Sequence, residues 1–205
     1  MISIDKKYAM ERYYGMLTRT YWNSNKWQDR PTQMDMDKRE NNADQEALNS
    51  ALNYGHKELN IAGTEFYQGY FHQLEETKPK PEDIKYVDVV FIQSKDILTG
   101  KEYITGLYAF PQFVTGRKDS PFDEHPYLKT NLKSLAANIH QLENYLDVET
   151  LDKKYFNFNK KKKGKLTYSF LTKYQVEKIL DTLTIANPDD KKLHAIKFKI
   201  LKSIL

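Results

Sequence analysis

The sequence predicts a mixed α+β domain whose sheet is curved and mostly antiparallel, with helices packed outside it. Runs typical of short strands alternate with helical patterns, and clusters of Gly, Pro, Asn and Asp separate them. The chain has 205 residues and no cysteine, so it can bury a core of useful size without disulfides. We therefore expect one domain, or one domain with an extension.

The first half of the chain favours strands. Its expected elements are a short helix over 5–14, a strand over 16–22, a helix over 43–52, and strands over 65–74, 86–94 and 103–113. The run YVDVVFIQS at 86–94 is continuous enough for a buried central strand. After it, KDILTGK is expected to turn the chain into a return strand, YITGLYAFPQF, which Pro111 ends.

The second half favours helices. We expect irregular chain over 114–127 and then a helix over 131–146, since Leu132, Leu135, Ile139, Leu142 and Leu146 recur at helical spacing. A hairpin is expected over 155–171, with NKKKKGK as its connection.

A capping box of Thr172 and Gln175 begins the next helix, and Asp189 is expected to cap the last one. The amphipathic pattern continues to Leu205, which fits either a piece of a longer protein or a C-terminal helix docked on the core. We place the core at 1–130 and a helical and basic hairpin extension at 131–205, packed on the same domain.

The charge is unevenly distributed along the chain. Residues 1–150 contain 18 Lys and Arg against 23 Asp and Glu, whereas residues 151–205 contain 14 Lys against 5 Asp and Glu. This basic quarter favours an anionic partner, and the alternative is a solvated lysine-rich surface. No apolar run is long enough for a membrane span, and the N-terminus lacks a signal peptide's apolar segment. We expect a cytoplasmic protein with no membrane partner.

Motifs for catalysis and cofactors are absent from the sequence. The five histidines lack metal-binding spacing, and there is no GxGxxG, P-loop or GxSxG motif. We expect no cofactor, no metal and no catalytic residue. One alternative stays open, because Asp83 or Asp88 precedes Gln93-Ser94-Lys95 in an arrangement similar to that of metal-dependent nucleases. Its geometry is unfavourable, since Asp88 and Gln93 point to opposite faces of one strand.

The hairpin over 87–110, VDVVFIQSKDILTGKEYITGLYAF, resembles the central hairpin of the PUA-like superfamily, in particular that of EVE and YTH-like domains. The resemblance rests on the apolar run 89–92, Ser94, Gly100, Tyr103, Gly106 and the pair 107–108, and it covers about a fifth of the chain. It implies a barrel-like, PUA/EVE-like core over 1–130 that binds nucleic acid. In that superfamily a base is flipped into a pocket of aromatic rings that reads its methyl group. Similar hairpins occur in sensor domains of modification-dependent restriction systems, where cleavage belongs to another domain or subunit.

From this resemblance we expect a non-enzymatic reader of double-stranded DNA with a modified, methylated base, associated with an NTPase or nuclease domain or subunit. The rings expected to form the pocket are Trp22, Trp27, Tyr70, Tyr108 and Phe110. The cations expected on the phosphates are Lys160, Lys161, Lys162, Lys163, Lys165, Arg117 and Lys118.

Strand alternation predicts how the rings of the return strand are divided between its two faces. It places Tyr108 and Phe110 on one face and Tyr103 with Leu107 on the other, and we expect the first face to line the pocket. Two alternatives to a DNA reader remain besides the nuclease. One is an RNA-binding PUA-like domain, and the other is a protein-interaction module that uses the last helix.

Overall fold

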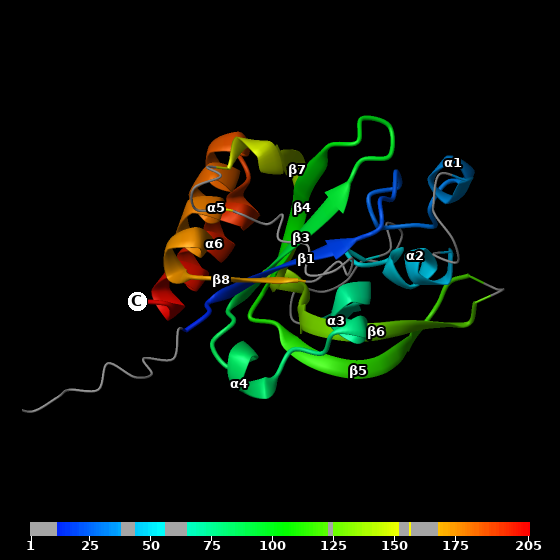
Figure 1. Ribbon diagram of the computed structural model, residues 1–205, viewed down its shortest axis with the longest axis horizontal. Coiled ribbons are helices and arrows are strands. Elements are labelled where there is room, and N and C mark those ends of the chain that lie inside the picture. Colours follow the sequence, from blue (N-terminus) through cyan, green and yellow to red (C-terminus); the bar gives the residue numbers. More distant parts are fainter. Residues whose placement is uncertain (1–11, 38–43, 56–64, 123–124, 152–155, 157–167) are drawn as a thin grey trace, which may run out of the picture.

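The structure, a computed structural model, describes residues 12–37, 44–55, 65–122, 125–151, 156 and 168–205. These residues form two β-sheets and a small number of helices (Figure 1). The predicted mixed α+β class is confirmed. The described strands form no closed barrel, so the barrel-like curvature stays a prediction.

The larger sheet has five strands in the order β7-β4-β3-β1-β8. Their bounds are β1 (Gly15–Thr20), β3 (Val89–Lys95), β4 (Glu102–Ala109), β7 (Ile139–Asp147) and β8 (Ser169–Leu171). The β1–β3 pair is parallel and the other pairs are antiparallel. The predicted central strand and its return strand are confirmed as β3 and β4, and the turn between them has Gly100 at φ +72°.

The smaller sheet has three antiparallel strands in the order β2-β6-β5, namely β2 (Phe66–Gly69), β5 (Gln112–Asp119) and β6 (Tyr127–Leu135). The chain enters this sheet through Phe110-Pro111 and returns to the larger one through the 3-10 turn η1 (Ala136–Asn138). The irregular stretch predicted over 114–127 and the helix predicted over 131–146 are therefore wrong. The predicted boundary at residues 130/131 falls inside β6.

The error over 131–146 has a structural cause. The buried positions of β6 are Leu128, Thr130, Leu132 and Ser134. Because Thr130 and Ser134 are polar, the sequence shows no apolar alternation that would predict a strand here. In β7 the register slips, because Ile104 pairs with Leu146 whereas Gly106 pairs with Gln141. Both faces of β7 are buried: Ile139 packs toward the smaller sheet, whereas Leu142 and Leu146 pack under the helices, so the three buried residues together imitate helical spacing.

The helices and helical turns are α1 (Gln33–Asp37), α2 (Asp44–Ser50), α3 (His72–Glu76), α4 (Pro81–Ile84), η2 (Val148–Thr150), α5 (Lys173–Ala186) and α6 (Lys191–Ser203). The predicted capping box of Thr172 and Gln175 is confirmed at α5. The cap of α6 is Asp190 rather than Asp189, with its carboxylate accepting from Leu193 N. The strand predicted over 65–74 ends early, since α3 begins at His72.

Parts of two predicted elements lie outside the described residues. Of the helix predicted over 5–14, only residues 12–14 are described, and these are not helical. Of the predicted hairpin over 155–171, the connection NKKKKGK lies outside them. The described end of that hairpin is β8, which pairs with β1.

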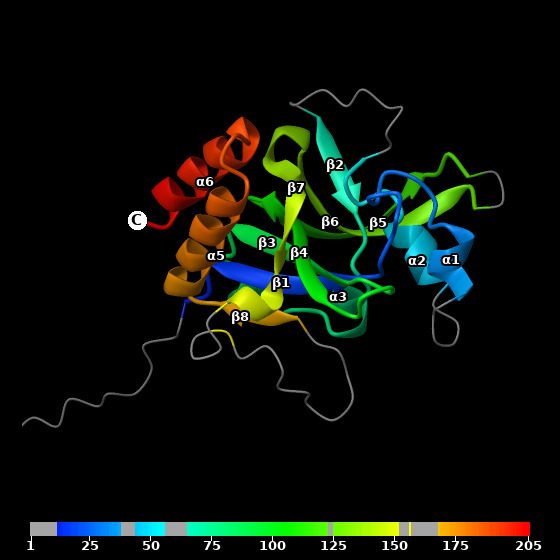
Figure 2. The ribbon, with the colours of Figure 1, turned by 90° about the horizontal axis from the view of Figure 1, so that it is seen from above.

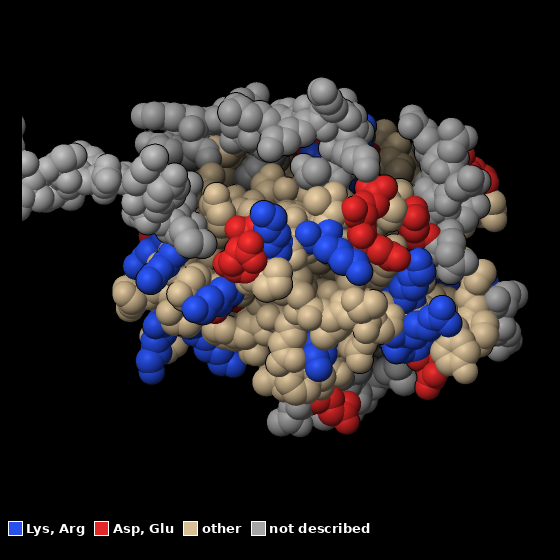
Figure 3. All heavy atoms as spheres, turned by 60° about the horizontal axis from the view of Figure 1, so that its bottom comes forward, with Lys and Arg blue, Asp and Glu red and all other residues tan. Residues whose placement is uncertain are grey.

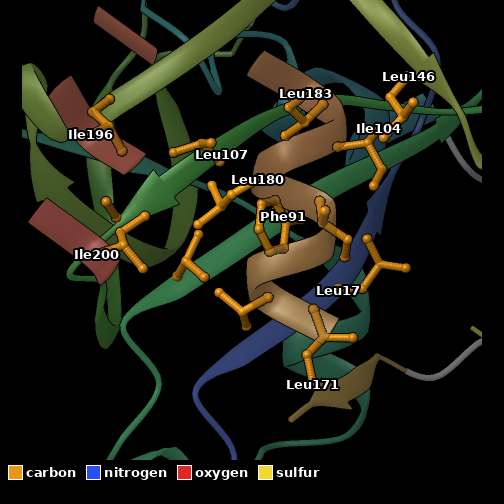
Figure 4. Packing of buried hydrophobic residues seen from close by; sticks show 14 of the residues in the cluster. Leu17, Phe91, Ile104, Leu107, Leu146, Leu171, Leu180, Leu183, Ile196 and Ile200 are labelled. Atoms are coloured by element: carbon orange, nitrogen blue, oxygen red, sulfur yellow. The ribbon is translucent and has the colours of Figure 1, made fainter. Parts of the chain in front are cut away.

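The two faces of the larger sheet are covered by different layers (Figures 1 and 2). Helices α5 and α6 pack on one face, and the smaller sheet with α3 lies on the other side. Between the helices and the sheet lies an apolar core that includes Phe91, Leu107, Leu180 and Ile196 (Figure 4). None of the described helices is long and apolar enough to cross a membrane.

Candidate functional site

Three aromatic rings from distant parts of the chain meet at one end of the larger sheet. Trp22 follows β1, Tyr103 lies near the start of β4, and Tyr145 lies near the end of β7. The ring centroids are 6.5 Å apart for Trp22–Tyr103, 6.1 Å for Trp22–Tyr145 and 6.3 Å for Tyr103–Tyr145, with the planes inclined at 46°, 88° and 52°. All three residues are half-buried. We call them the aromatic triad.

A buried layer of rings supports the aromatic triad from inside. Trp27 is fully buried, its Nε1 donates to Tyr21 O at 2.7 Å, and its ring lies edge-on to Trp22 at 5.7 Å. Tyr54 packs against Trp27 at 5.9 Å, and its hydroxyl shares a hydrogen bond with Thr105 Oγ1 at 3.2 Å. Burial raises the pKa of Tyr54, so its hydroxyl stays neutral. The layer is therefore rigid and uncharged.

The loop WNSNKW places both tryptophans through its own polar side chains. Asn23 Nδ2 donates to Asp29 O at 2.9 Å, which closes the loop between the two rings. The buried carboxylate of Asp35 accepts from Ser24 N and Oγ and from Thr32 N. Although burial acts in the opposite direction, these hydrogen bonds lower the pKa of Asp35 and keep it charged. The polar residues of the loop therefore hold Trp27 in the core.

Of the five rings predicted for the pocket, only Trp22 is both half-buried and part of the aromatic triad. Trp27, Tyr70 and Tyr108 are at most 2% exposed, so they pack inside rather than line an open pocket. The hydroxyl of Tyr108 donates a hydrogen bond to the carbonyl oxygen of Asn53, and the hydroxyl of Tyr70 donates one to the carboxylate of Glu75. Phe110 packs against the core beneath α5 and α6.

The predicted division of the β4 rings is also wrong. Between Ile92/Gly106 and Gln93/Ile104 the β3–β4 register shifts, and Thr105 is the extra residue. Because a bulge reverses alternation, Ile104 joins Leu107 in the core under the helices, while Tyr103 joins the aromatic triad. At the other end, φ of +50° at Phe110 separates its ring from that of Tyr108.

Tyr145 is the site residue that sequence reasoning missed. The helix predicted over 131–146 placed this ring on the wrong kind of element. Its partner in the structure is Gln141, whose Nε2 donates to the Tyr145 hydroxyl at 3.1 Å. The alternation Leu128, Thr130, Leu132 and Ser134 indicates a strand in β6 once Thr and Ser are allowed at inward positions, and it argues against a helix that begins at residue 131.

The predicted phosphate-binding cations fall into three groups. Lys160, Lys161, Lys162, Lys163 and Lys165 lie outside the described residues. Arg117 is exposed on β5. Lys118 points inward, and its Nζ donates to Leu52 O at 3.2 Å, to the Tyr67 hydroxyl at 3.1 Å and to Gln68 O at 2.6 Å. Burial lowers the pKa of Lys118 to about 7. Its role in the structure is to join β5 to β2 and to the turn that follows α2.

Arg117 lies on a groove of about 410 Å³ between β5, β6 and the segment after α3. The lining residues are Leu74, Glu75, Lys78, Pro79, Phe113, Val114, Thr115, Gly116, Arg117, Lys129, Thr130 and Asn131. On the face seen in Figure 3, Lys and Arg side chains are interspersed with acidic groups and uncharged surface. The described part of this face therefore has local positive sites rather than one continuous basic patch.

The nuclease-like residues are engaged in separate contacts. Asp88 accepts from Ser203 Oγ at 2.7 Å, and Gln93 Nε2 donates to Glu102 Oε2 at 2.6 Å. Within the described ranges, no group of three or more His, Asp and Glu side chains is arranged to hold a metal ion. In the last helix, α6, Phe198 lies between Lys197 and Lys199 in the chain and is 70% exposed.

Comparison with known proteins gives no relative. No family model, no curated protein and no solved structure matches the chain.

Proposed function

We propose that the chain is a non-enzymatic nucleic-acid-binding module that recognises a modified, methylated base flipped into the aromatic triad. The observation that supports this function best is the meeting of Trp22, Tyr103 and Tyr145 at a half-buried site. The three rings contact one another, and because they are half-buried their outer surfaces offer an apolar patch on which a small flat or methylated group can stack. The proposal keeps DNA as the nucleic acid and corrects the set of rings.

The energetics of base flipping agree with this arrangement. Extruding a base costs a few kcal/mol, and stacking on aromatic rings returns about 1–3 kcal/mol per base. Rings already held in place lose little further conformational freedom on binding. Trp27 and Tyr54 supply this support, because both pack against their neighbours within 6 Å and are fixed by hydrogen bonds.

The phosphates are assigned to Arg117, which is exposed on β5, and to the lysines that the sequence predicts for this role. The lysines of the NKKKKGK segment and Arg117 belong to this proposal as phosphate contacts, which salt would weaken. Lys118 is removed from it, because its three donated hydrogen bonds all go to groups inside the protein. Cleavage of the bound DNA is assigned to another domain or subunit, such as a nuclease coupled to an NTPase.

The test is a titration of methylated and unmodified duplexes of the same sequence. We expect tighter binding of the methylated duplex, and Trp22→Ala should reduce this preference about tenfold, since one stacking ring contributes about 1–3 kcal/mol. Phe198→Ala is the matched aromatic control, because Phe198 is exposed and lies outside the triad. Equal affinities of the unaltered protein for the two duplexes would refute a modified-base reader. A methylated RNA of equal length decides between DNA and RNA by competition.

A further inference from the structure

The groove beside β5 is built around a bulge. Phe113 pairs with Leu132 and Gly116 pairs with Thr130, so Val114 and Thr115 together oppose the single residue Asn131. A bulge leaves one residue out of the hydrogen-bonded ladder and bends the strand. Here the bulged residues line the groove, and β5 is an edge strand. The bulged residues Val114 and Thr115 therefore border the groove at the edge of the sheet.

The opposite wall of the groove is anchored to the same sheet. Asn131 holds the start of α3, since its Oδ1 accepts from Phe71 N at 2.9 Å and its Nδ2 donates to Phe71 O at 2.8 Å. Leu74 and Pro79, which follow, contribute apolar surface to the groove, as do Phe113 and Val114 from β5. The groove is thus bordered by apolar side chains from β5 and from the segment that begins with α3, and Asn131 ties that segment to β6.

The charge of the groove is positive. Lys129 is paired with Glu75 at 2.9 Å. Burial opposes ionisation of Glu75, but hydrogen bonds from Tyr70 and Lys129 lower its pKa and keep it charged. In the part of the chain that is described, Lys78 and Arg117 have no ion-pair partner. Two cations without an ion-pair partner among the described residues therefore line the same groove as these apolar side chains.

We propose that this groove binds the sugar-phosphate backbone of one nucleic-acid strand, with Arg117 and Lys78 on the phosphates and the apolar lining residues against the sugars. Arg matches phosphate oxygens with two parallel hydrogen bonds, and Lys acts as a point charge. This inference rests on the nucleic-acid binding of the proposed function and gives part of the strand a place on the molecule.

The length of the groove favours a strand over a single small anion. Five consecutive residues of β5, from Phe113 to Arg117, line it. At about 3.3 Å per residue this wall extends about 13 Å. The wall is therefore longer than a single phosphate group and can border neighbouring phosphates of one strand.

The experiment measures affinity against salt concentration for Arg117→Gln and Lys78→Gln, with methylated and unmodified duplexes and with a single strand. Each variant should weaken binding to all of these by the same factor, and should reduce the slope of log affinity against log salt by about one. Lys95→Gln is the charge-matched control, because Lys95 is exposed on β3 and does not line the groove. Both altered side chains at the groove are exposed, and circular dichroism checks that the variants fold.

The outcomes separate the groove from the aromatic triad. If Arg117→Gln and Lys78→Gln keep the affinity and salt slope of the unaltered protein, the groove proposal is wrong, whatever Trp22→Ala does. If both variants lose affinity equally for all ligands while the unaltered protein shows no methyl preference, the groove stands and the modified-base reader is wrong. Displacement of the bound strand by a poly-glutamate peptide of equal charge and concentration would overturn the assignment to a strand in favour of an acidic peptide.

Discussion

The two faces of the five-stranded sheet are packed by different chemistry. Toward α5 and α6 the core is mostly aliphatic, and its buried side chains include Leu17, Phe91 and Leu180. Toward the smaller sheet, rings and polar groups are buried together, and Asn53 bonds both the N–H and the carbonyl of Tyr70. Aliphatic contacts are non-directional, whereas hydrogen bonds fix positions and orientations. The face toward α5 and α6 is therefore held mainly by non-directional contacts, and the face toward the smaller sheet also by hydrogen bonds that fix the buried rings.

The largest effect is expected on the aliphatic face. Phe91→Ala should lower the free energy of unfolding by about 3–5 kcal/mol, because Phe91 is fully buried and its loss leaves a cavity. Phe198→Ala, at a ring that is 70% exposed, should change it by less than about 0.5 kcal/mol. Urea-induced unfolding measures both, and similar values for the two variants would contradict the assigned core.

A smaller destabilisation, accompanied by a change in fluorescence, is expected where Tyr54 packs against the larger sheet. In Gly106→Ala the new Cβ would overlap the carbonyl oxygen of His140 and lie 2.5 Å from the Tyr54 hydroxyl oxygen. We expect a destabilisation of about 1–3 kcal/mol. Tryptophan fluorescence should also change, because Tyr54 packs against Trp27. In Gly116→Ala the nearest atom is Thr130 Oγ1 at 3.1 Å, so this control should be milder and leave the fluorescence unchanged.

The smallest effect, taken over a single pH unit, is expected from the titration of Lys118. Burial lowers the pKa of this amine from 10.5 to about 7 in the folded protein. Between these values the unfolded chain binds the proton more tightly, so stability rises with pH, by up to about 1.4 kcal/mol per pH unit. Unfolding measured from pH 7.5 to pH 9.5 should reveal this slope, and Lys118→Met should lack it. An identical slope in both proteins would show that Lys118 keeps its proton.

Local chemistry made several elements predictable from the sequence. The continuous apolar run in β3 is typical of a strand that is buried on both faces. Gly100 permits the turn into β4 because its φ is positive. Thr172 and Gln175 begin α5 by bonding to each other's backbone, which requires no distant partner. Each of these signals acts within a few residues.

The elements that failed depend on distant partners. Whether 131–146 is helix or strand was decided by the pairing of β6 with β2 and β5 and of β7 with β4. The same pairing, with its bulge, places Tyr145 beside Tyr103. Propensity could not decide this, because Leu, Asn and Gln are tolerated in both kinds of element once tertiary contacts are available.

By itself, the sequence determined the α+β class, the central hairpin, the cap of α5 and the charge asymmetry, because composition and short-range backbone chemistry suffice for these. Only the tertiary structure decided which rings meet. The bulge in β4 reverses the alternation that the sequence implies, strand pairing brings Tyr145 of β7 beside Tyr103, and the WNSNKW loop buries Trp27 while leaving Trp22 half-buried. Register and loop closure are set by contacts between residues far apart in the chain, and one shifted residue moves a side chain to the opposite face.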